Sequence, residues 1–351
     1  MPSVREHDRE GVVAAGIGIA VLGTGRIGHL HALNAARALP GAYLVGVADV
    51  DPLAAARTIE AARSGRSVAD YRELLADPEV QAVVICTPTE SHARIMGEAA
   101  DAGKHILCEK PIALTLEETR AALDAVAARG VLLAIGFNRR YDPAHVAAKR
   151  TLDHGEIGEP WIVKLVGRDP RPAPLSYLAS SGGLFKDQAI HEFDLACWLI
   201  GRPVEEVFAT GSVLVDPRIG ALGDVDTALT TLRFEGGALG LVDNCRQAVY
   251  GYDVRAEIHG SAGKLIIGHE ARTAVTLLQP DSASHDHVDW FLDRFADAFR
   301  DELIDFVACV REGRRPRAGG EDGYKALQIA VAAGRSLRER RAISIAEVTS
   351  G

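Results

Sequence analysis

Cysteine is scarce in this chain, and the few cysteines present are not arranged in pairs. Its 351 residues include five, with no C-x-x-C spacing anywhere. An odd number without paired spacing predicts neither a disulfide framework nor a cysteine-based zinc site. Reduced thiols are typical of the cytoplasm, where we expect this protein to reside. The five residues are Cys86, Cys108, Cys197, Cys245 and Cys309.

Long apolar runs and an excess of positive charge are also lacking. No stretch approaches the roughly 18 apolar residues of a membrane span, and the charged start lacks the basic-then-apolar order of a secretory signal. We expect residues 1–15 to form a disordered extension. Lysine and arginine total 39 against 48 acidic residues, a net charge of −9. Because nucleic acids and anionic membranes attract basic surfaces, we expect neither as a partner.

Several well-known catalytic motifs are missing as well. The sequence contains no G-x-S-x-G and no G-x-x-x-x-G-K-[ST], so it supports neither a serine hydrolase of that type nor a P-loop NTPase. The segment His285-Asp286-His287 resembles a fragment of a metal site. A zinc site needs at least three protein ligands, and no further ligand is identifiable, so we expect a polar loop and no metal.

In the first half of the chain, strand and helix patterns alternate. Such alternation predicts right-handed βαβ units and a parallel sheet, the α/β fold class. Apolar or β-branched runs predict strands at residues 17–22, 43–48, 80–86, 105–108 and 131–136, and helical spacing fills the intervals at 29–38, 52–64, 92–102 and 116–128.

The second half has a different pattern. Strands joined by short turns alternate there with a few helices. This pattern predicts an α+β domain with a largely antiparallel sheet. We place the boundary near residues 137–141, giving a first domain at 16–138 and a second at 139–351. The predicted strands are 160–166, 204–214, 227–234, 238–244, 254–259 and 264–267, and the main helices are 185–200, 291–312 and 323–339.

A glycine-rich turn follows the first predicted strand and indicates a dinucleotide site. It reads Gly23-Thr24-Gly25-Arg26-Ile27-Gly28. The first glycine permits the tight turn, the second lets a pyrophosphate approach the backbone, and the third lets the next helix pack closely. The helix N-terminus then offers free N–H groups to the phosphates. Asp49 lies 21 positions beyond Gly28, where a carboxylate accepts from a ribose hydroxyl and repels a 2′-phosphate, so NAD is favoured over NADP.

Three further residues suggest hydroxyl chemistry. Lys110 follows a predicted strand in Cys108-Glu109-Lys110-Pro111, at the strand end where α/β sheets bind ligands. Asp187 and His191 are four residues apart, a spacing that puts both on one face of a helix. A histidine beside a carboxylate takes a proton from a hydroxyl near neutral pH. The same spacing is also expected of a helix-terminal carboxylate and a core histidine that have no catalytic role. Most lysines, likewise, are solvated surface residues.

Taken together, these motifs resemble the Gfo/Idh/MocA oxidoreductases. The resemblance covers nearly the whole chain from about Gly16. Within the family, the sequence most resembles the inositol dehydrogenases. The family motifs are Gly23–Gly28, C-E-K-P at 108–111, G-F-N-R-R-Y-D at 136–142 and D-x-x-x-H-x-x-D at 187–194, and the narrower match rests on Arg168-Asp169-Pro170, Ser181-Gly182-Gly183, residues 211–223 and Tyr250-Gly251-Tyr252-Asp253.

The resemblance implies an NAD-binding, doubly wound Rossmann domain followed by a domain with an open, mostly antiparallel sheet, in a homodimer or homotetramer. It implies that His191 is the general base, Asp187 its partner, and Lys110 the group that polarises the reacting oxygen. The cofactor side would include Thr87, Pro88, Glu109, Lys110 and Asn138. The substrate side would include Arg139, Asp169 and Tyr252 beside the catalytic set.

The implied reaction is oxidation of myo-inositol to its 2-keto form with reduction of NAD. Alternatives are the same chemistry on scyllo- or chiro-inositol or on an aldose, an NAD-dependent glycoside hydrolase, and a non-catalytic NAD sensor. The sequence departs from some inositol dehydrogenases, which carry histidine and asparagine where this chain has Gly167 and Asp169. These departures leave the preferred stereoisomer open.

Overall fold

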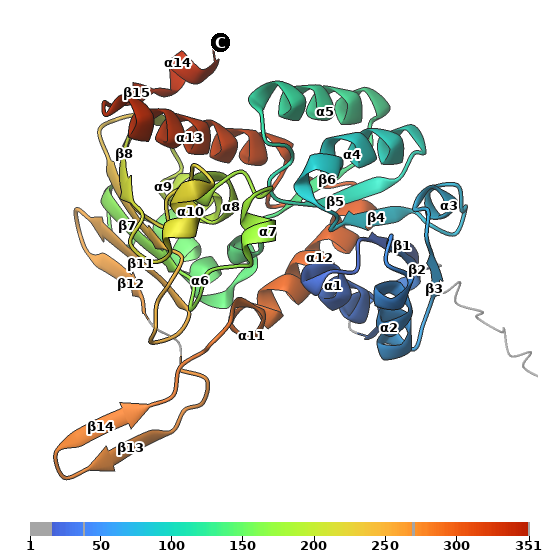
Figure 1. Ribbon diagram of the computed structural model, residues 1–351, viewed down its shortest axis with the longest axis horizontal. Coiled ribbons are helices and arrows are strands. Elements are labelled where there is room, and N and C mark those ends of the chain that lie inside the picture. The colour runs from blue at the N-terminus through green and yellow to red at the C-terminus, as the bar shows by residue number, and fades with distance from the viewer. Residues whose placement is uncertain (1–15, 38, 269–270, 350–351) are drawn as a thin grey trace, which may run out of the picture.

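The computed structural model describes residues 16–37, 39–268 and 271–349 (Figure 1). The extension expected at residues 1–15 lies outside the described residues. In the described part, no helix is both long enough and apolar enough to cross a membrane.

The first half of the chain forms a six-stranded, fully parallel sheet, which confirms the α/β prediction. Its order reverses between β1 and β4, and ligands of such sheets bind in the crevice at that point. The strands in spatial order are β3 (Arg66–Val68), β2 (Ala42–Ala48), β1 (Ile17–Leu22), β4 (Ala82–Ile85), β5 (His105–Glu109) and β6 (Leu133–Gly136). The main connecting helices are α1 (Arg26–Arg37), α2 (Pro52–Ala62), α4 (His92–Asp101) and α5 (Leu116–Arg129).

Local chemistry accounts for these elements. Ile19 to Leu22 of β1 have no exposed surface, as expected for a parallel strand covered on both faces. Helix α2 begins where the Asp51 side chain accepts from the Leu53 N–H, with Pro52 in its first turn, an arrangement that satisfies a free helix donor. Helix α5 ends at Gly130, which adopts the left-handed conformation.

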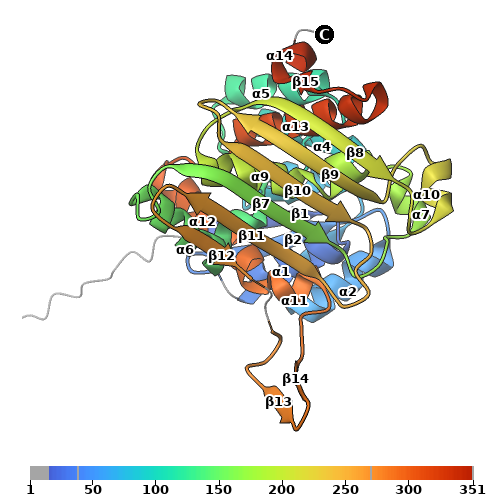
Figure 2. The ribbon, with the colours of Figure 1, turned by 90° about the vertical axis from the view of Figure 1, so that its left-hand side faces the viewer.

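The second half forms a seven-stranded sheet that is antiparallel throughout except where β7 pairs with β10. Helices lie behind this sheet in Figure 2, and its other face is bare. The alternating burial along β9 agrees with one covered and one open face. The strands in spatial order are β12 (Lys264–Ile267), β11 (Asp253–Gly260), β7 (Pro160–Arg168), β10 (Leu239–Cys245), β9 (Thr227–Phe234), β8 (Val204–Ser212) and β15 (Ile343–Ser344).

Helices from the end of the chain pack onto the first sheet. Leu303 and Phe306 of α12 (Ala296–Glu312) belong to one hydrophobic cluster with Ile19 and Val84 of the Rossmann core. Helix α13 (Gly320–Glu339) contacts both the first-half helix α5 and the second-half strand β8. The two halves therefore share packed surfaces, and the site between them is built from both.

Two predicted helices are interrupted. The segment predicted as one helix over 185–200 forms α8 (Leu184–Asp187) and α9 (Ile190–Ile200). At the break, the Gln188 amide donates to the carbonyl oxygens of Gly167 and Cys245, a tertiary interaction that helical periodicity does not reveal. Likewise, the segment predicted over 291–312 is divided into α11 (Phe291–Arg294) and α12.

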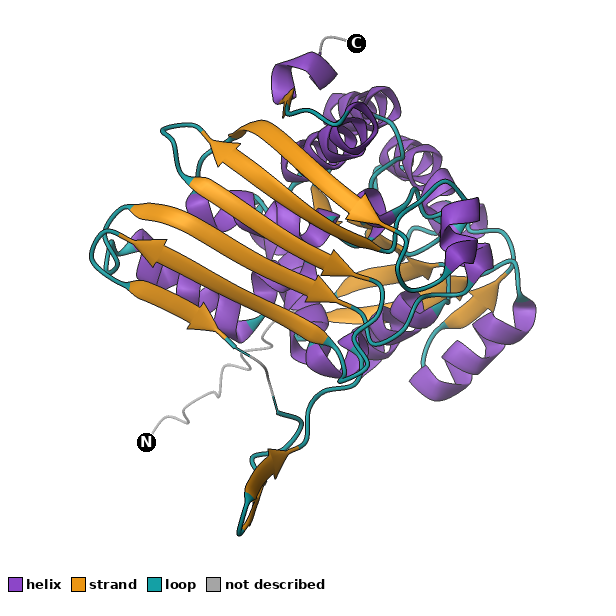
Figure 3. Ribbon diagram, turned by 60° about the vertical axis from the view of Figure 1, so that its left-hand side comes forward, coloured by secondary structure: helices purple, strands orange, loops and turns teal. Residues whose placement is uncertain are grey.

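A hairpin formed by β13 (Thr276–Gln279) and β14 (Ser282–His285) projects away from the body of the protein (Figures 1 and 3). All eight strand residues are exposed. The remaining elements are α3 (Arg72–Leu75), the 3-10 helices η1 (Thr89–Ser91) and η2 (Asn138–Tyr141), α6 (Pro143–Asp153), α7 (Leu175–Leu178), α10 (Pro217–Ala221) and α14 (Ile345–Thr349).

Candidate active site

Lys110 and Asp187, which are 77 positions apart in the sequence, meet between the two sheets. The Lys110 ammonium donates to the backbone carbonyl of Asp187 at 2.7 Å, and it lies 3.6 Å from the carboxylate oxygen Oδ1. Both side chains are about one-seventh exposed, at 14% and 13%. The Lys110–Pro111 peptide bond is cis. A partly exposed lysine held at the end of β5 is available to a ligand in the crevice.

The Asp187 carboxylate has two further partners that the sequence analysis did not identify. The Tyr177 hydroxyl donates to Oδ1 at 2.8 Å, and Arg246 donates to Oδ2 at 3.2 Å. Arg246 is 1% exposed and also pairs with Asp224 at 3.2 Å. Two cations and a hydroxyl therefore surround and orient the Asp187 carboxylate.

His191 lies near this group on α9 without bonding to Asp187. Its Nδ1 has no hydrogen-bond partner among the described residues, so the direct partnership expected from the four-residue spacing is absent. The His191 ring packs edge-on against Phe137, with ring centroids 6.2 Å apart. Enclosure by the protein lowers the pKa of His191 well below its usual value, and the charges of Lys110 and Arg139 lower it further. The imidazole is therefore neutral at pH 7, the form that accepts a proton.

Arg139 and Glu192 form a buried ion pair beside the catalytic group. Asn244 donates to the other oxygen of Glu192 at 3.0 Å. The guanidinium expected to face a substrate is thus already engaged by protein. Helix α9 is otherwise largely apolar but carries two carboxylates, Glu192 and Asp194. These were the one sequence signal that pointed to such a buried pair.

Asp169 and Tyr252 complete the polar wall. Burial raises the pKa of Asp169 to about 7, with a further contribution from the charge of Asp187. Burial likewise raises the pKa of Tyr252, which is 9% exposed. Near neutral pH, Asp169 therefore both donates and accepts hydrogen bonds, as hydroxyl recognition requires.

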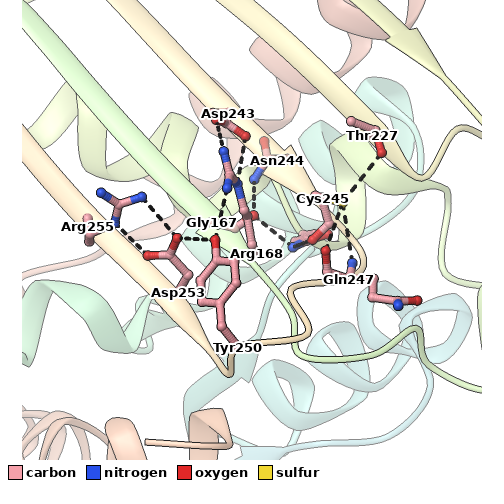
Figure 4. Close-up of polar contacts among 11 residues, drawn as sticks. Gly167, Arg168, Thr227, Asp243, Asn244, Cys245, Gln247, Tyr250, Asp253 and Arg255 are labelled. Atoms are coloured by element: carbon pink, nitrogen blue, oxygen red, sulfur yellow. Dashed lines mark hydrogen bonds and ion pairs between the residues drawn. The ribbon is translucent and has the colours of Figure 1, made fainter. Parts of the chain in front are cut away.

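Gly167, one of the two departures noted in the sequence, has no room for a side chain. A Cβ there would lie 2.2 Å from Glu192 Oε1, and the Gly167 carbonyl accepts from Asn244 at 3.1 Å. Its neighbour Arg168 lies on the opposite face of β7, where it pairs with Asp243 and donates to the Tyr250 hydroxyl at 2.9 Å (Figure 4). The space that a histidine would need is filled by Glu192.

We expect Gly167→Ala to lower the stability of the protein by roughly 1–3 kcal/mol, the usual cost of overpacking a core. Thermal unfolding of the purified variant measures this effect. Gly97→Ala is the matched control, since Gly97 lies inside helix α4 with nothing within 4 Å of the added carbon. That control should gain about 0.5–1 kcal/mol from helix propensity. Equal midpoints for the two variants would contradict the tight contact with Glu192.

The glycine loop has the shape that a pyrophosphate requires. Gly23 has a φ of +89°, and a Cβ there would lie 2.7 Å from the Cys86 backbone. A Cβ on Gly28 would lie 1.8 Å from the carbonyl oxygen of Gly23, whereas one on Gly25 would meet nothing within 4 Å. Two glycines are therefore needed for packing, and the middle one leaves an open approach to the first turn of α1.

Asp49 is fixed at the end of β2 beside this loop. Its Oδ2 accepts from the backbone N–H and hydroxyl of Thr24 at 2.6 and 2.7 Å, and its Oδ1 accepts from the Asp51 N–H at 2.9 Å. Partial burial alone would raise the pKa of Asp49, but the hydrogen bonds from Asp51 and Thr24 outweigh burial and lower it. The carboxylate is thus ionised and oriented next to the phosphate loop.

The remaining predicted cofactor residues lie at or just after the carboxyl ends of strands in the parallel sheet. Thr87 and Pro88 follow β4, and Asn138 is buried in η2. Arg26 is exposed at the start of α1, with its guanidinium 5.5 Å from the centre of the Trp290 ring. The Glu109 carboxyl lies 3.6 Å from His31, an unforeseen contact.

Comparison with known proteins agrees with this geometry. Residues 17–137 match the profile of an oxidoreductase family, NAD-binding Rossmann fold, and residues 149–345 match the C-terminal alpha/beta domain of the same family. The chain is 42% identical to myo-inositol 2-dehydrogenase of Thermotoga maritima, over 94% of this chain and 99% of the relative. It is 41% identical to an NAD⁺-dependent scyllo-inositol 2-dehydrogenase of Bacillus subtilis, over 91% and 93% respectively.

A solved structure is also similar along almost its full length. It is the scyllo-inositol dehydrogenase of Lactobacillus casei with bound NAD(H) and scyllo-inositol, with a TM-score of 0.89, 28% identity, and coverage of 94% of this chain and 99% of that one. The match to both family domains and to full-length relatives above 40% identity shows that this chain, with its NAD-binding Rossmann domain, belongs to the Gfo/Idh/MocA family of oxidoreductases.

Proposed function

We propose that this protein oxidises a secondary hydroxyl of a cyclic polyol to a ketone with NAD, most specifically myo-inositol to 2-keto-myo-inositol. The observation that carries the proposal is the meeting of Lys110 and Asp187 beside a neutral His191, at the same edge of the parallel sheet as the glycine loop. Two full-length relatives named as inositol 2-dehydrogenases support the same reaction.

In this proposal, NAD supplies the hydride acceptor, and the protein supplies proton transfer and charge stabilisation. His191 takes the proton of the reacting hydroxyl, because its imidazole is neutral at the working pH. Lys110 donates a hydrogen bond to the same oxygen and stabilises the alkoxide that develops there. Asp187 keeps the Lys110 ammonium in place, and Arg246 fixes Asp187 from the other side.

We assign cofactor binding to the glycine loop and to the rim of the crevice. Gly23, Gly25 and Gly28 would cradle the pyrophosphate, with the N-terminus of α1 facing it. Asp49 would accept from the adenosine ribose. The residues proposed to line the remainder of the cofactor are Arg26, Ile27, Thr87, Pro88, Glu109 and Asn138.

We assign recognition of the other ring hydroxyls to Asp169, Tyr252 and Arg139. Burial raises the pKa of Asp169 to about 7, which suits a hydroxyl that donates as well as accepts. Arg139 would act together with Glu192, its buried partner. Every hydroxyl of an inositol ring can both donate and accept a hydrogen bond, so an array of mixed donors and acceptors fits such a ring.

The decisive experiment measures NADH formation with purified protein against myo-, scyllo- and chiro-inositol and a set of aldoses. We expect turnover with myo-inositol and release of one NADH per ketone formed. Preference for scyllo-inositol is the second candidate, favoured by the relative of that name at 41% identity. Absence of turnover with every inositol would overturn the proposal, and sugar release without net NADH would indicate a glycoside hydrolase.

The role of Asp49 in choosing the cofactor leads to a separate prediction. Replacing Asp49 with serine removes the ribose acceptor and the negative charge, so we expect KM for NAD to rise about tenfold, equivalent to roughly 1.4 kcal/mol. The preference for NAD over NADP should fall with it, while kcat with saturating NAD changes little. Asp51→Ser, at the neighbouring helix cap, serves as control. An unchanged NAD-to-NADP ratio would assign the discrimination to another group.

We also propose a cytoplasmic homotetramer, with residues 16–138 as the cofactor domain and 139–351 as the substrate and oligomerisation domain. The bare face of the seven-stranded sheet exposes large apolar side chains that monomers rarely leave in contact with water. Five unpaired cysteines accord with a reducing compartment. Sedimentation velocity should give the mass of four chains, and a monomer mass would contradict the assembly. The exposed side chains are Trp161, Phe208, Leu229, Leu239 and Ile266.

A further inference from the structure

A second cluster of ionisable side chains lies behind the strand end that carries Lys110. It consists of His31 on α1, Glu109 at the end of β5 and Glu302 on α12, whose ring nitrogen and carboxylate oxygens lie within 4.8 Å of one another. His31 and Glu302 are 0% and 1% exposed, and the Glu109 side chain is 14% exposed. Three elements distant in sequence thus converge on one buried polar point.

None of the facing atoms is satisfied within the described residues. Both ring nitrogens of His31, Oε1 of Glu109 and both carboxylate oxygens of Glu302 lack a hydrogen-bond partner there. His31 Nε2 lies 3.6 Å from Glu109 Oε1, too far for a direct hydrogen bond. Burying two carboxylates without compensation is costly. The cluster must therefore hold something positive, either a proton or a cation.

The groups around the cluster add further negative charge. Glu302 is acted on by the charges of Glu109 and of Asp305. Cys86, directly after β4, and Tyr141 of η2 also interact electrostatically with Glu302. On the α1 side, the His31 ring packs edge-on against Phe299, with centroids 5.8 Å apart. Burial, aided by these carboxylates, raises the pKa of Glu302 well above its usual value.

We propose that Glu302 is protonated in the native enzyme and that the cluster thereby positions the strand end bearing Lys110. Its link to catalysis rests on the proposed role of Lys110. The Glu109 carboxyl is directly adjacent in sequence to Lys110, and a Cβ on Gly136 would lie 2.9 Å from it. Glu109 is thus confined between β6 and the cluster. A second negative charge on Glu302 would push Glu109 out of this place and shift Lys110.

Thermal unfolding across pH tests the protonation directly. Between the pKa of an unfolded glutamate, about 4.3, and its raised native value, Glu302 holds its proton only in the folded state. Stability from this group is therefore complete at low pH and is lost as pH rises. Glu302→Gln mimics the neutral form and removes this titration. We expect the unfolding midpoint of the variant, relative to wild type, to rise as the pH increases above about 5.

The matched control is Glu312→Gln, on the same helix with a 61% exposed side chain, for which we expect no pH-dependent difference. A difference for Glu302→Gln that stays constant with pH would overturn the proposal. This measurement requires no substrate, so it remains decisive even if the proposed reaction fails.

Kinetics and metal analysis supply the other two readouts. Glu302→Ala should lower kcat by roughly 10- to 100-fold through displacement of Lys110, and Glu302→Gln should recover most of that loss. Equal losses in both variants would contradict a protonated Glu302. Elemental analysis after incubation with Zn²⁺, Mn²⁺ or Mg²⁺ should find no more metal in wild type than in Glu302→Gln. One metal per chain in wild type alone would show that a cation occupies the cluster instead, and would overturn the proposal.

Discussion

Replacing His191 with alanine is expected to lower kcat by roughly 10²–10⁴-fold, the usual contribution of a general base, while the affinity for NAD changes little. The expectation follows from the neutral imidazole beside Lys110. His191 acts on the proton of the substrate, whereas the dinucleotide is bound through the glycine loop. Steady-state kinetics with the preferred inositol, together with fluorescence titration of NAD, separate the two effects.

The control for this experiment is His154→Ala, because His154 is exposed at the end of α6 and remote from the crevice. That variant should retain wild-type kinetics. An equal loss of kcat and of NAD affinity in His191→Ala would mean that the residue supports the cofactor site rather than the proton transfer.

The general fold was readable from the sequence because its signals are local. Buried parallel strands such as β1 are continuous apolar runs, and the glycine loop is confined to six residues. The short strand β15 was not predicted, since two residues become a strand only by pairing with β8. The break between α8 and α9 was missed for a similar reason, because it depends on Gln188 reaching the carbonyl groups of two distant strands.

Only part of the candidate site could be predicted from the sequence. The ion pairs that hold its charged side chains could not. Motif spacing and the resemblance identified Lys110, Asp187 and His191. They did not reveal the hydrogen bonds and ion pairs that these residues form. Asp187 lies beside Lys110 and Arg246, 77 and 59 positions away. Arg246 carried no motif, and a lone arginine after a strand is usually solvated. Its complete burial between two carboxylates becomes visible only when β10 is placed next to α8.

This electrostatic arrangement makes Lys110 the subject of the second large prediction. Lys110→Met removes the donor to the developing alkoxide, and we expect kcat to fall by about 10²–10³-fold, as for loss of one oxyanion donor. The same change should alter the pH dependence of the activity that remains. The positive charge of Lys110 lowers the pKa of His191, so its removal moves that pKa back up.

The direction in which the pH profile shifts can be predicted, because only the neutral imidazole accepts the proton. Activity is lost as pH falls through the pKa of His191, so the acidic limb of kcat/KM should lie well below pH 6.5 in wild type and at higher pH in Lys110→Met. Lys110→Arg keeps the charge and should keep the low limb even where its geometry costs turnover. Lys149→Met, at a surface ion pair with Asp153, should change neither quantity. If the acidic limb does not move in Lys110→Met, the charge coupling between Lys110 and His191 is refuted, and the low pKa of the histidine must come from its enclosure and from the charge of Arg139.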